Sequence, residues 1–312
     1  MKIIIELPTW LGDTVMATPA IENLVSHFDN VKITLIGSFV AISALKNHPK
    51  VHKTYLIEKQ YINLYKSLKN LDEFDVFLSF RSSLRSKFIK LCVSSKRKYQ
   101  FDKKKYLNEH QVIKYNNFIN DSLNINTLAS KLTLHINDNN QYKNPVTKNR
   151  LLGINPGGSY GSAKRWYPKE FADVAIDLSS QYDIIIFGGP DEKDITKDIE
   201  NYLIEKGVVN YQNMAAQTSI EELISIISNL DLFITGDSGS MHIAAAFQIA
   251  TVAIFGPTKD NETSQWMNQK GIIVKKNLEC QPCMKRTCPL KHHNCMKMIA
   301  ASDVLKSVKT FD

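Results

Sequence analysis

Apolar runs of strand length alternate with stretches of helical character along the whole chain. The strand-like runs of the first half lie at 2–7, 32–37, 53–58 and 75–80, with helix-like stretches such as 13–28 between them. Those of the second half lie at 151–157, 183–189, 231–237 and 251–257. Strands followed by Gly-rich turns and then by helices predict an α/β protein with two doubly wound, Rossmann-like domains.

A polar stretch separates the two halves. Residues 136–150 (INDNNQYKNPVTKNR) are rich in Asn and Lys and are interrupted by Pro145, which is typical of a linker. We therefore expect one domain at 1–147 and the other at 148–312. Two such domains are expected to face each other across a cleft, with ligands at the carboxyl ends of the strands.

Length and composition favour a cytoplasmic enzyme. The chain has 312 residues and is 43% hydrophobic, enough for two cores. The N-terminal MKIIIELPTW has too short an apolar run for a signal peptide, and the longest apolar stretch, MHIAAAFQIATVAIF, is shorter than a membrane span. Four of the five cysteines crowd between 280 and 295, which does not suit a secreted disulfide framework.

The net charge of +8 is unevenly distributed. Residues 1–150 hold 23 Lys and Arg against 12 Asp and Glu, whereas residues 151–312 hold 16 against 19. The densest basic stretch, 81–105, contains ten cationic residues and one acidic residue, Asp102. Solvated helix faces explain most single lysines, but the surface also suits anionic lipid or a phosphorylated glycan. No helix-turn-helix, zinc-finger or RNP-type pattern accompanies the charge, which disfavours nucleic acid.

Two strand-to-helix turns carry candidate chemistry. In PTWLGDTVMATPAI (8–21), Asp13 opens a helix directly after the first strand, where it can be an N-cap, a catalytic base or both. In NPGGSYGSAKRWYPKEF (155–171), a Gly-rich loop precedes Lys164 and a helix that starts near Pro168. Glycines allow close backbone approach and the lysine adds a mobile positive charge, which favours a diphosphate ligand. The spacing matches neither a P-loop nor a dinucleotide fingerprint.

A third turn, TGDSGSMHIAAA (235–246), contains the Gly-Asp-Ser-Gly sequence that surrounds many protease nucleophiles. It lies between an apolar strand and an Ala-rich helix, so we interpret Ser238 as a cap or phosphate ligand rather than as a nucleophile. His242, one turn into this helix, is expected to contact the same anion.

Four motifs in this order resemble the ADP-heptose:lipopolysaccharide heptosyltransferases. They are GDTVMATPAI (12–21), NPGGSYGSAKRW (155–166), DSGSMHIAAAF with TVAIFGPT (237–258), and CQPCMKRTCPLKHHNCM (280–296). The resemblance covers nearly the whole chain, is weakest at about 45–145, and in the tail is closest to the type II members. It implies a GT-B glycosyltransferase that inverts the sugar carbon and needs no metal.

The resemblance also implies roles for individual residues. Asp13 matches the catalytic base, and Lys164 matches the lysine at the donor phosphates. The expected donor-binding residues are Gly12, Gly157, Ser159, Lys164, Thr218, Asp237, Ser238, Gly239 and His242, with either Asp191 or Glu192 at the nucleoside. Arg81 and Arg85 resemble basic positions that face the acceptor.

The implied partners are ADP-heptose and a phosphorylated, Kdo-containing lipid A core, with possible peripheral contact with the inner membrane. The implied reaction moves L-glycero-D-manno-heptose to the inner core. Transfer by a type I enzyme, transfer to a protein hydroxyl and a non-catalytic nucleotide-sugar binding module remain alternatives.

The cysteine cluster does not belong to this scheme. Cys280, Cys283, Cys288 and Cys295, with His292 and His293 among them, offer enough ligands for tetrahedral zinc. Only the first pair has the familiar spacing, which favours reduced, structural cysteines without a metal.

Overall fold

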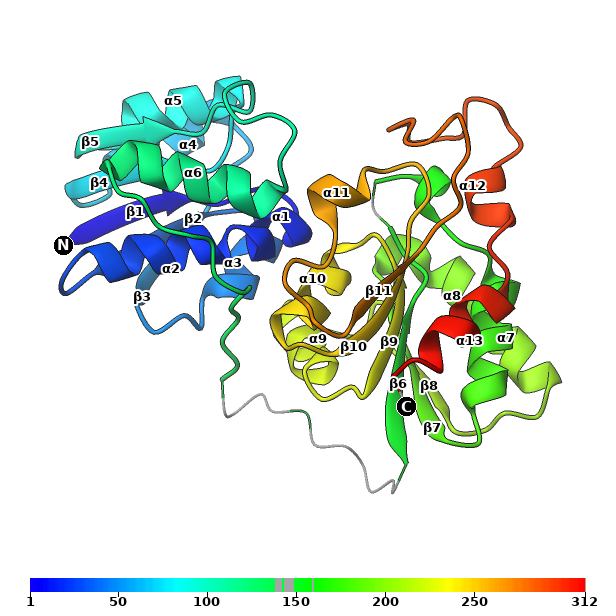
Figure 1. The fold of residues 1–312 in the computed structure, drawn as a ribbon. Coiled ribbons are helices and arrows are strands. Elements are labelled where there is room, and N and C mark those ends of the chain that lie inside the picture. The colour runs from blue at the N-terminus through cyan, green and yellow to red at the C-terminus, as the bar shows by residue number, and fades with distance from the viewer. Residues whose placement is uncertain (138–141, 143–148, 159, 312) are drawn as a thin grey trace. The chain divides into compact units, whose positions relative to one another are not determined.

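The computed structural model describes residues 1–137, 142, 149–158 and 160–311. The chain divides into two compact units, Met1–Asn137 and Asp138–Asp312, and each contains a parallel sheet with helices packed on it (Figure 1). The predicted domain boundary at 147/148 lies outside the described residues.

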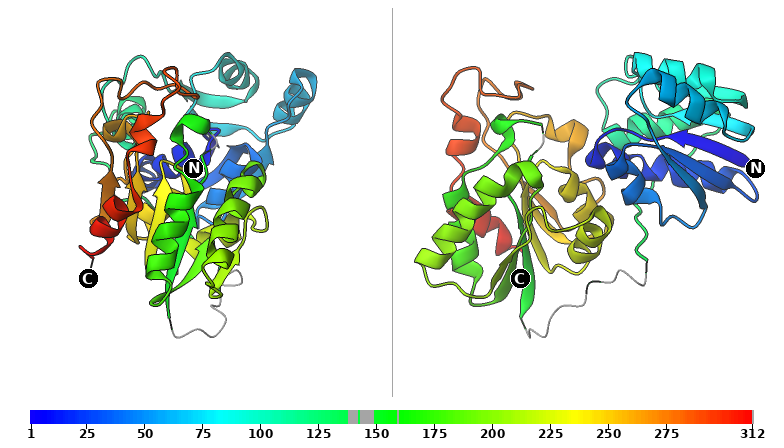
Figure 2. Two further views of the ribbon diagram at one scale, coloured as in Figure 1. Left: turned by 90° about the vertical axis from the view of Figure 1, so that its right-hand side faces the viewer. Right: turned by 180° about the vertical axis from the view of Figure 1, so that it is seen from behind.

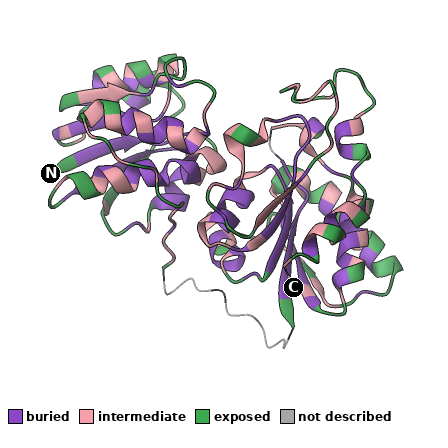
Figure 3. Cartoon of the chain, in the orientation of Figure 1, coloured by how far each residue is buried: buried purple, intermediate pink, exposed green. Residues whose placement is uncertain are grey.

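Unit 1 contains a five-stranded parallel sheet in the order β3-β2-β1-β4-β5. Its strands are β1 Lys2–Glu6, β2 Lys32–Gly37, β3 Val51–Leu56, β4 Phe74–Ser79 and β5 Ser95–Gln100. Its helices are α1 Leu11–Met16, α2 Thr18–His27, α3 Phe39–Leu45, α4 Tyr61–Lys69, α5 Leu84–Cys92 and α6 Gln111–Leu123. The central strands β1, β2 and β4 are apolar and almost fully buried, as a sheet covered on both faces requires (Figure 3).

Two local features of unit 1 differ from the predicted pattern. Strand β5 has the polar sequence SKRKYQ and escaped prediction within the basic stretch, because an edge strand with one neighbour tolerates charged side chains. The helix predicted at 13–28 is two helices, α1 and α2. Pro19 lies in the first turn of α2, where its missing N–H is no loss.

Unit 2 contains a six-stranded parallel sheet in the order β11-β10-β9-β6-β7-β8. Figure 2 shows helices packed against this sheet. Its strands are β6 Arg150–Asn155, β7 Tyr182–Ile186, β8 Tyr211–Asn213, β9 Leu232–Gly236, β10 Ala250–Ile254 and β11 Gly271–Val274. Its α-helices are α7 Pro168–Leu178, α8 Lys193–Glu205, α9 Ile220–Ile227, α10 Gly239–Ala246, α11 Asp260–Thr263, α12 Asn294–Lys297 and α13 Ala301–Val308. Two 3-10 turns, η2 Ser162–Lys164 and η3 Pro190–Glu192, complete it. Counted from β6, this is the doubly wound strand order 3-2-1-4-5-6.

The order of the strands determines where polar groups gather in each unit. In unit 1 the chain reverses direction across the sheet between β1 and β4, and in unit 2 it does so between β6 and β9. Loops that leave such neighbouring strands diverge to opposite faces and leave room for a ligand at the carboxyl edge. The predicted turns at 8–13, 156–164 and 237–242 all follow one of these strands.

Candidate active site

The Gly-rich loop after β6 is fixed by hydrogen bonds from both sides. Asn155, the last residue of β6, accepts a hydrogen bond on Oδ1 from the Gly157 N–H at 3.1 Å. The Glu192 carboxylate accepts two more, from the Gly158 N–H at 2.7 Å and from the Gly189 N–H at 2.7 Å. A Cβ atom at Gly157 would meet the Glu192 carboxylate, so a larger residue there would push Glu192 away from these two hydrogen bonds. The loop is therefore held in one shape.

Lys164 and Asp237 form an ion pair at the carboxyl edge of the unit 2 sheet. Lys164 ends the η2 turn, and its Nζ lies 2.6 Å from Asp237 Oδ2; the two side chains are 12% and 8% exposed. Asp237 directly follows β9, and the same carboxylate oxygen accepts a hydrogen bond from Thr258 Oγ1 at 2.7 Å. Trp166, whose Nε1 donates to the Ile299 carbonyl at 2.9 Å, anchors the loop in the core. The amine is thus held in place before any ligand binds.

Ser238 is the N-cap of α10 and lies within a network of hydroxyl groups. Its Oγ accepts a long hydrogen bond from the Met241 N–H at 3.4 Å and lies 3.0 Å from Thr235 Oγ1 and 2.9 Å from Ser240 Oγ. A serine committed to capping and to hydroxyl neighbours fits the interpretation as a cap. His242, in the same helix, is buried with 3% exposure. Because α10 starts beside Lys164, its N-terminal N–H groups and the amine together favour an anion.

The other predicted donor residues are spread over three segments of unit 2. Glu192 braces the Gly-rich loop, whereas Asp191 is exposed on η3. Thr218 is half-buried in the turn between β8 and α9, next to the Ser219–Glu222 capping box of α9. Ser159 lies outside the described residues. The choice between Asp191 and Glu192 at a nucleoside remains a prediction, although Glu192 already has two backbone partners.

Asp13 lies in the first turn of α1, after β1 in unit 1, and is partly buried. Gly12 precedes it in the same turn. The charge of Asp13 contributes, after burial, to raising the pKa of Tyr115 well above its usual range. The carboxylate therefore lies where its charge influences the interior of unit 1, at the edge of the sheet where β1 and β4 diverge.

A buried carboxylate that the motifs did not reveal lies at this edge. Glu6, the last residue of β1, is fully buried and accepts hydrogen bonds from Ser79 Oγ at 2.7 Å and Ser86 Oγ at 2.8 Å. Arg81 Nη1 lies 3.6 Å from it. Burial raises the pKa of Glu6, and the two hydroxyls and the nearby arginines oppose that rise. The signal in the sequence was a lone acidic residue that ends an apolar strand.

The two arginines predicted at the acceptor differ in their surroundings. Arg81 follows β4 and faces Glu6. Arg85, in α5, donates to the backbone carbonyls of Glu58 and Lys59 and lies 5.3 Å from the centre of the Tyr61 ring. Arg85 therefore fixes the segment before α4, whereas Arg81 faces Glu6 directly, and the charges of both arginines oppose the rise in the pKa of Glu6.

Glu22, His48 and His135 form a second polar cluster in unit 1, with donor atoms within 4.8 Å of one another. His48 Nδ1 accepts the Lys50 N–H at 3.1 Å, so the proton of the neutral ring lies on Nε2 and points to Glu22 Oε1, also at 3.1 Å. A metal at Nε2 would need that proton to move to Nδ1, against the Lys50 N–H. We therefore interpret the cluster as hydrogen-bonded rather than as a metal site.

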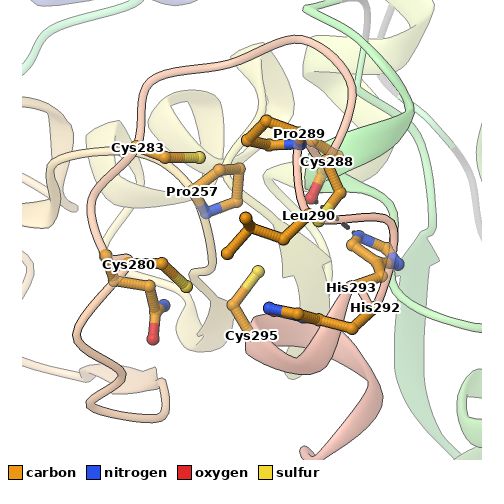
Figure 4. A pocket seen from close by; sticks show the side chains of 11 residues that line it. Pro257, Cys280, Cys283, Cys288, Pro289, Leu290, His292, His293 and Cys295 are labelled. Carbon is orange, nitrogen blue, oxygen red and sulfur yellow. Dashed lines mark hydrogen bonds between the residues drawn. The ribbon is translucent and has the colours of Figure 1, made fainter.

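The cysteines near the C-terminus line one pocket of unit 2 (Figure 4). Its other lining residues include His292, His293 and Pro257. Burial, followed by the charges of the three neighbouring cysteines, raises the pKa of Cys295 to about 11. The four thiols are therefore close enough to influence one another.

Two parallel, doubly wound units of this kind are the architecture of the GT-B glycosyltransferases. The structure matches solved heptosyltransferases over nearly full length. One is an E. coli ADP-heptose lipopolysaccharide heptosyltransferase II (TM-score 0.85, 19% identity, 99% of this chain and 98% of that one). Another is an E. coli heptosyltransferase solved with ADP (TM-score 0.77, 12% identity, 100% of both chains).

The sequence comparisons identify the family. Residues 61–294 match the model of glycosyltransferase family 9 (heptosyltransferase). A lipooligosaccharide heptosyltransferase 2 from Campylobacter jejuni serotype O:2 is 43% identical over 99% of this chain and 98% of its own length. One from Haemophilus ducreyi is 27% identical over 88% of both chains. The chain belongs to glycosyltransferase family 9, the heptosyltransferases, and the prediction of a GT-B glycosyltransferase is confirmed.

Proposed function

We propose that this enzyme transfers L-glycero-D-manno-heptose from ADP-heptose to the heptose-Kdo-lipid A inner core of lipopolysaccharide or lipooligosaccharide, as a type II enzyme. The observation that carries the proposal is the buried Lys164–Asp237 pair beside the N-terminus of α10, in a chain similar over its full length to lipooligosaccharide heptosyltransferases 2. The reaction inverts the anomeric carbon, and no metal ion takes part in it.

The donor diphosphate binds between Lys164 and the start of α10. Charge builds on the leaving ADP as the glycosidic bond breaks, and the Lys164 amine with the N–H groups that follow Ser238 stabilises it. A well-placed donor of this kind contributes roughly 3–4 kcal/mol to the transition state. Because Asp237, which Thr258 holds by a hydrogen bond, already fixes the amine, little reorganisation is needed when the charge develops. Fixed cationic and dipolar groups can then do the work that a divalent ion does elsewhere.

Asp13 acts as the general base. A sugar hydroxyl is a poor nucleophile near neutral pH, so a carboxylate that removes its proton during attack speeds transfer by about 10²–10⁴-fold. Attack from the face opposite ADP inverts the sugar carbon. Arg81 and the other basic groups of unit 1 favour a core that carries Kdo carboxylates and phosphates. Among the described residues, no helix has both the length and the apolar character of a membrane span. We propose that the enzyme works in the cytoplasm, with peripheral contact at the inner membrane, because its acceptor is a lipid-linked core.

ADP release from ADP-heptose with purified inner-core acceptor tests the proposal, without added divalent metal and with EDTA present. The wild type should turn over, and Asp13→Asn should be at least about a hundredfold slower because the amide cannot accept the proton. Equal rates would remove Asp13 from the mechanism.

The choice of acceptor separates the alternatives. Turnover on a core that lacks the first heptose would indicate a type I enzyme, and turnover on a protein would indicate a protein heptosyltransferase. Donor binding without turnover on any of them would indicate a binding module.

A further inference from the structure

The Gly-rich loop of unit 2 lies directly against the irregular segment between β11 and α12. The Arg286 carbonyl accepts the Ala163 N–H at 3.0 Å, and the Met284 carbonyl accepts the Tyr160 hydroxyl at 2.7 Å. A Cβ atom at Gly161 would collide with the Arg286 carbonyl oxygen, so the two backbones touch. The main chain of Arg286 is therefore fixed beside the η2 turn.

The aromatic ring of Tyr160 lies close to two cations. Lys164 Nζ is 5.4 Å from the ring centre, and the Arg286 guanidinium carbon Cζ is 5.5 Å from it. A contact with the face of a ring uses none of the N–H donors in the guanidinium plane, so these donors remain able to bind an anion. The Arg286 guanidinium thus lies near the amine that we place at the donor diphosphate.

The charge of Arg286 is not balanced within the protein. The residue is exposed, and its side chain forms no ion pair with a carboxylate of the described residues. Lys164, in contrast, is paired with Asp237. Arg165 follows Lys164 but has no cation–π contact with Tyr160 or with any other described ring, so it does not share the position of Arg286.

The donor loop needs more positive charge than Lys164 provides. The charge of Lys164 is already opposed by Asp237, and Glu192 adds a second carboxylate at the same loop. A nucleoside diphosphate brings further negative charge, which grows on the leaving group during transfer. If no metal ion takes part, side chains and backbone N–H groups must balance this charge. A guanidinium is well suited to that task, because its planar set of donors matches the oxygens of a phosphate.

We propose that Arg286 is a second cation of the donor site and that its guanidinium binds the diphosphate of the nucleotide sugar together with Lys164. The inference rests on the proposed function and adds a residue to its donor site. It gives the motif at 280–296 a direct part in the reaction through its arginine and not through its cysteines. Arg286 then stabilises the charge that develops on ADP as the glycosidic bond breaks.

Calorimetric titration of the purified full-length protein with ADP tests this role without donor sugar or acceptor. Arg286→Ala should weaken ADP binding by about ten- to a hundredfold, the loss expected when one charge-assisted hydrogen bond to a phosphate is removed. The variant keeps the backbone carbonyl that accepts the Ala163 N–H, so the loop should keep its shape. Arg286→Lys should recover part of the affinity, because it restores the charge but not the planar set of donors.

Lys285→Ala is the matched control, since Lys285 is exposed, adjacent in sequence and of the same charge. It should change the Kd for ADP by less than about twofold, because the charge of an exposed group without direct contact is screened by salt. Equal losses in both variants would indicate a general attraction to a basic segment and would overturn the assignment to Arg286. The assignment would also fail if Arg286→Ala lowered the stability of the ligand-free protein and Arg286→Lys recovered no affinity, because the arginine would then serve the fold.

The same titration separates this inference from the proposed transfer reaction. Wild-type protein that binds ADP no more tightly than Arg286→Ala does would overturn the role of Arg286 and leave the transfer reaction standing. Wild-type protein that binds no ADP would overturn both.

Steady-state kinetics give a further readout. Arg286→Ala should lower kcat at least about tenfold and leave the KM for the acceptor unchanged, because the guanidinium acts on the leaving ADP. A raised acceptor KM with an unchanged kcat would place Arg286 at the acceptor and would overturn the proposal.

Discussion

In both units, polar side chains lie at the carboxyl ends of the two strands between which the chain reverses direction. The two units differ in the charge of these side chains. Glu6 ends β1 opposite Ser79 of β4, and Asn155 ends β6 opposite Thr235 of β9. In unit 1 the group at this edge is a buried carboxylate satisfied by two hydroxyls and faced by Arg81. In unit 2 the neutral amide of Asn155 orients the Gly-rich loop. The charged groups, Lys164 and Asp237, lie in the segments that follow β6 and β9.

That difference shows what topology decides and what the side chains decide. Parallel winding brings the loops after β1 and β4 to the carboxyl edge of the unit 1 sheet, and the loops after β6 and β9 to the carboxyl edge of the unit 2 sheet. The sign of the charge offered there depends on the residues. Unit 2 holds its lysine in an ion pair near the N-terminus of α10, which suits a diphosphate. Unit 1 offers the carboxylate of Asp13, which we propose as the general base.

The largest expected effect comes from removing the lysine of the Lys164–Asp237 ion pair in unit 2. Lys164→Met should lower kcat by about 10²–10³-fold, as loss of one transition-state donor does. It should also destabilise the protein by about 3–5 kcal/mol, because Asp237 is left buried and unpaired. The measurements are steady-state kinetics and denaturant unfolding.

Two variants separate the catalytic effect from the structural one. Adding Asp237→Asn to Lys164→Met should restore most of the stability but not the activity. Lys169→Met, which removes an exposed lysine paired with Asp173, should change neither. A double variant that recovers kcat would show that Lys164 serves the fold rather than the phosphates.

The sequence predicted the class of fold and most of the central strands because their apolar runs are long and bounded by Gly-rich turns. It missed β5, β8 and β11, which are edge strands that are charged or short. Tertiary pairing, rather than local pattern, makes such segments strands.

At the site, the motifs located the loops correctly but could not give the contacts within them. Lys164 and Asp237 were both predicted to face the donor, and the structure pairs them with each other. Nothing in the spacing revealed that Glu192 braces the Gly-rich loop or that Glu6 is buried among hydroxyls, because these contacts join segments far apart in sequence.

A smaller effect is expected at two matched helix caps, one in each unit. Ser238 caps α10 in unit 2 and Ser38 caps α3 in unit 1, where it accepts the Ala41 N–H at 3.3 Å. Replacing either serine by alanine should cost about 0.5–2 kcal/mol of stability, the usual loss for an N-cap. Only Ser238→Ala should also weaken ADP binding, measured by calorimetry.

Two substitutions at Ser238 test its interpretation as a helix cap. Ser238→Thr should keep both stability and turnover, because threonine also caps helices. If Ser238→Ala abolished turnover while leaving ADP affinity and stability unchanged, Ser238 would have a chemical role that capping does not explain.

The smallest expected effect is a pH dependence confined to unit 1. Burial and the neighbouring His48 lower the pKa of His135, and the hydrogen bond from His48 lowers that of Glu22. Below the ordinary histidine value of 6.5, the unfolded chain therefore takes up a proton that folded His135 resists, and stability falls. Glu22 contributes stability above its ordinary pKa of 4.5, and this stability is lost as the pH falls through its lowered pKa in the folded protein.

Both pKa shifts act in the same direction. Hydrogen exchange in peptides of unit 1 should therefore show weaker protection as the pH falls below 6.5, after correction for the intrinsic exchange rate. His135→Gln should flatten this dependence, because the amide does not titrate. An equal loss of protection in unit 2 of the same samples would assign the effect to the whole chain and not to this cluster.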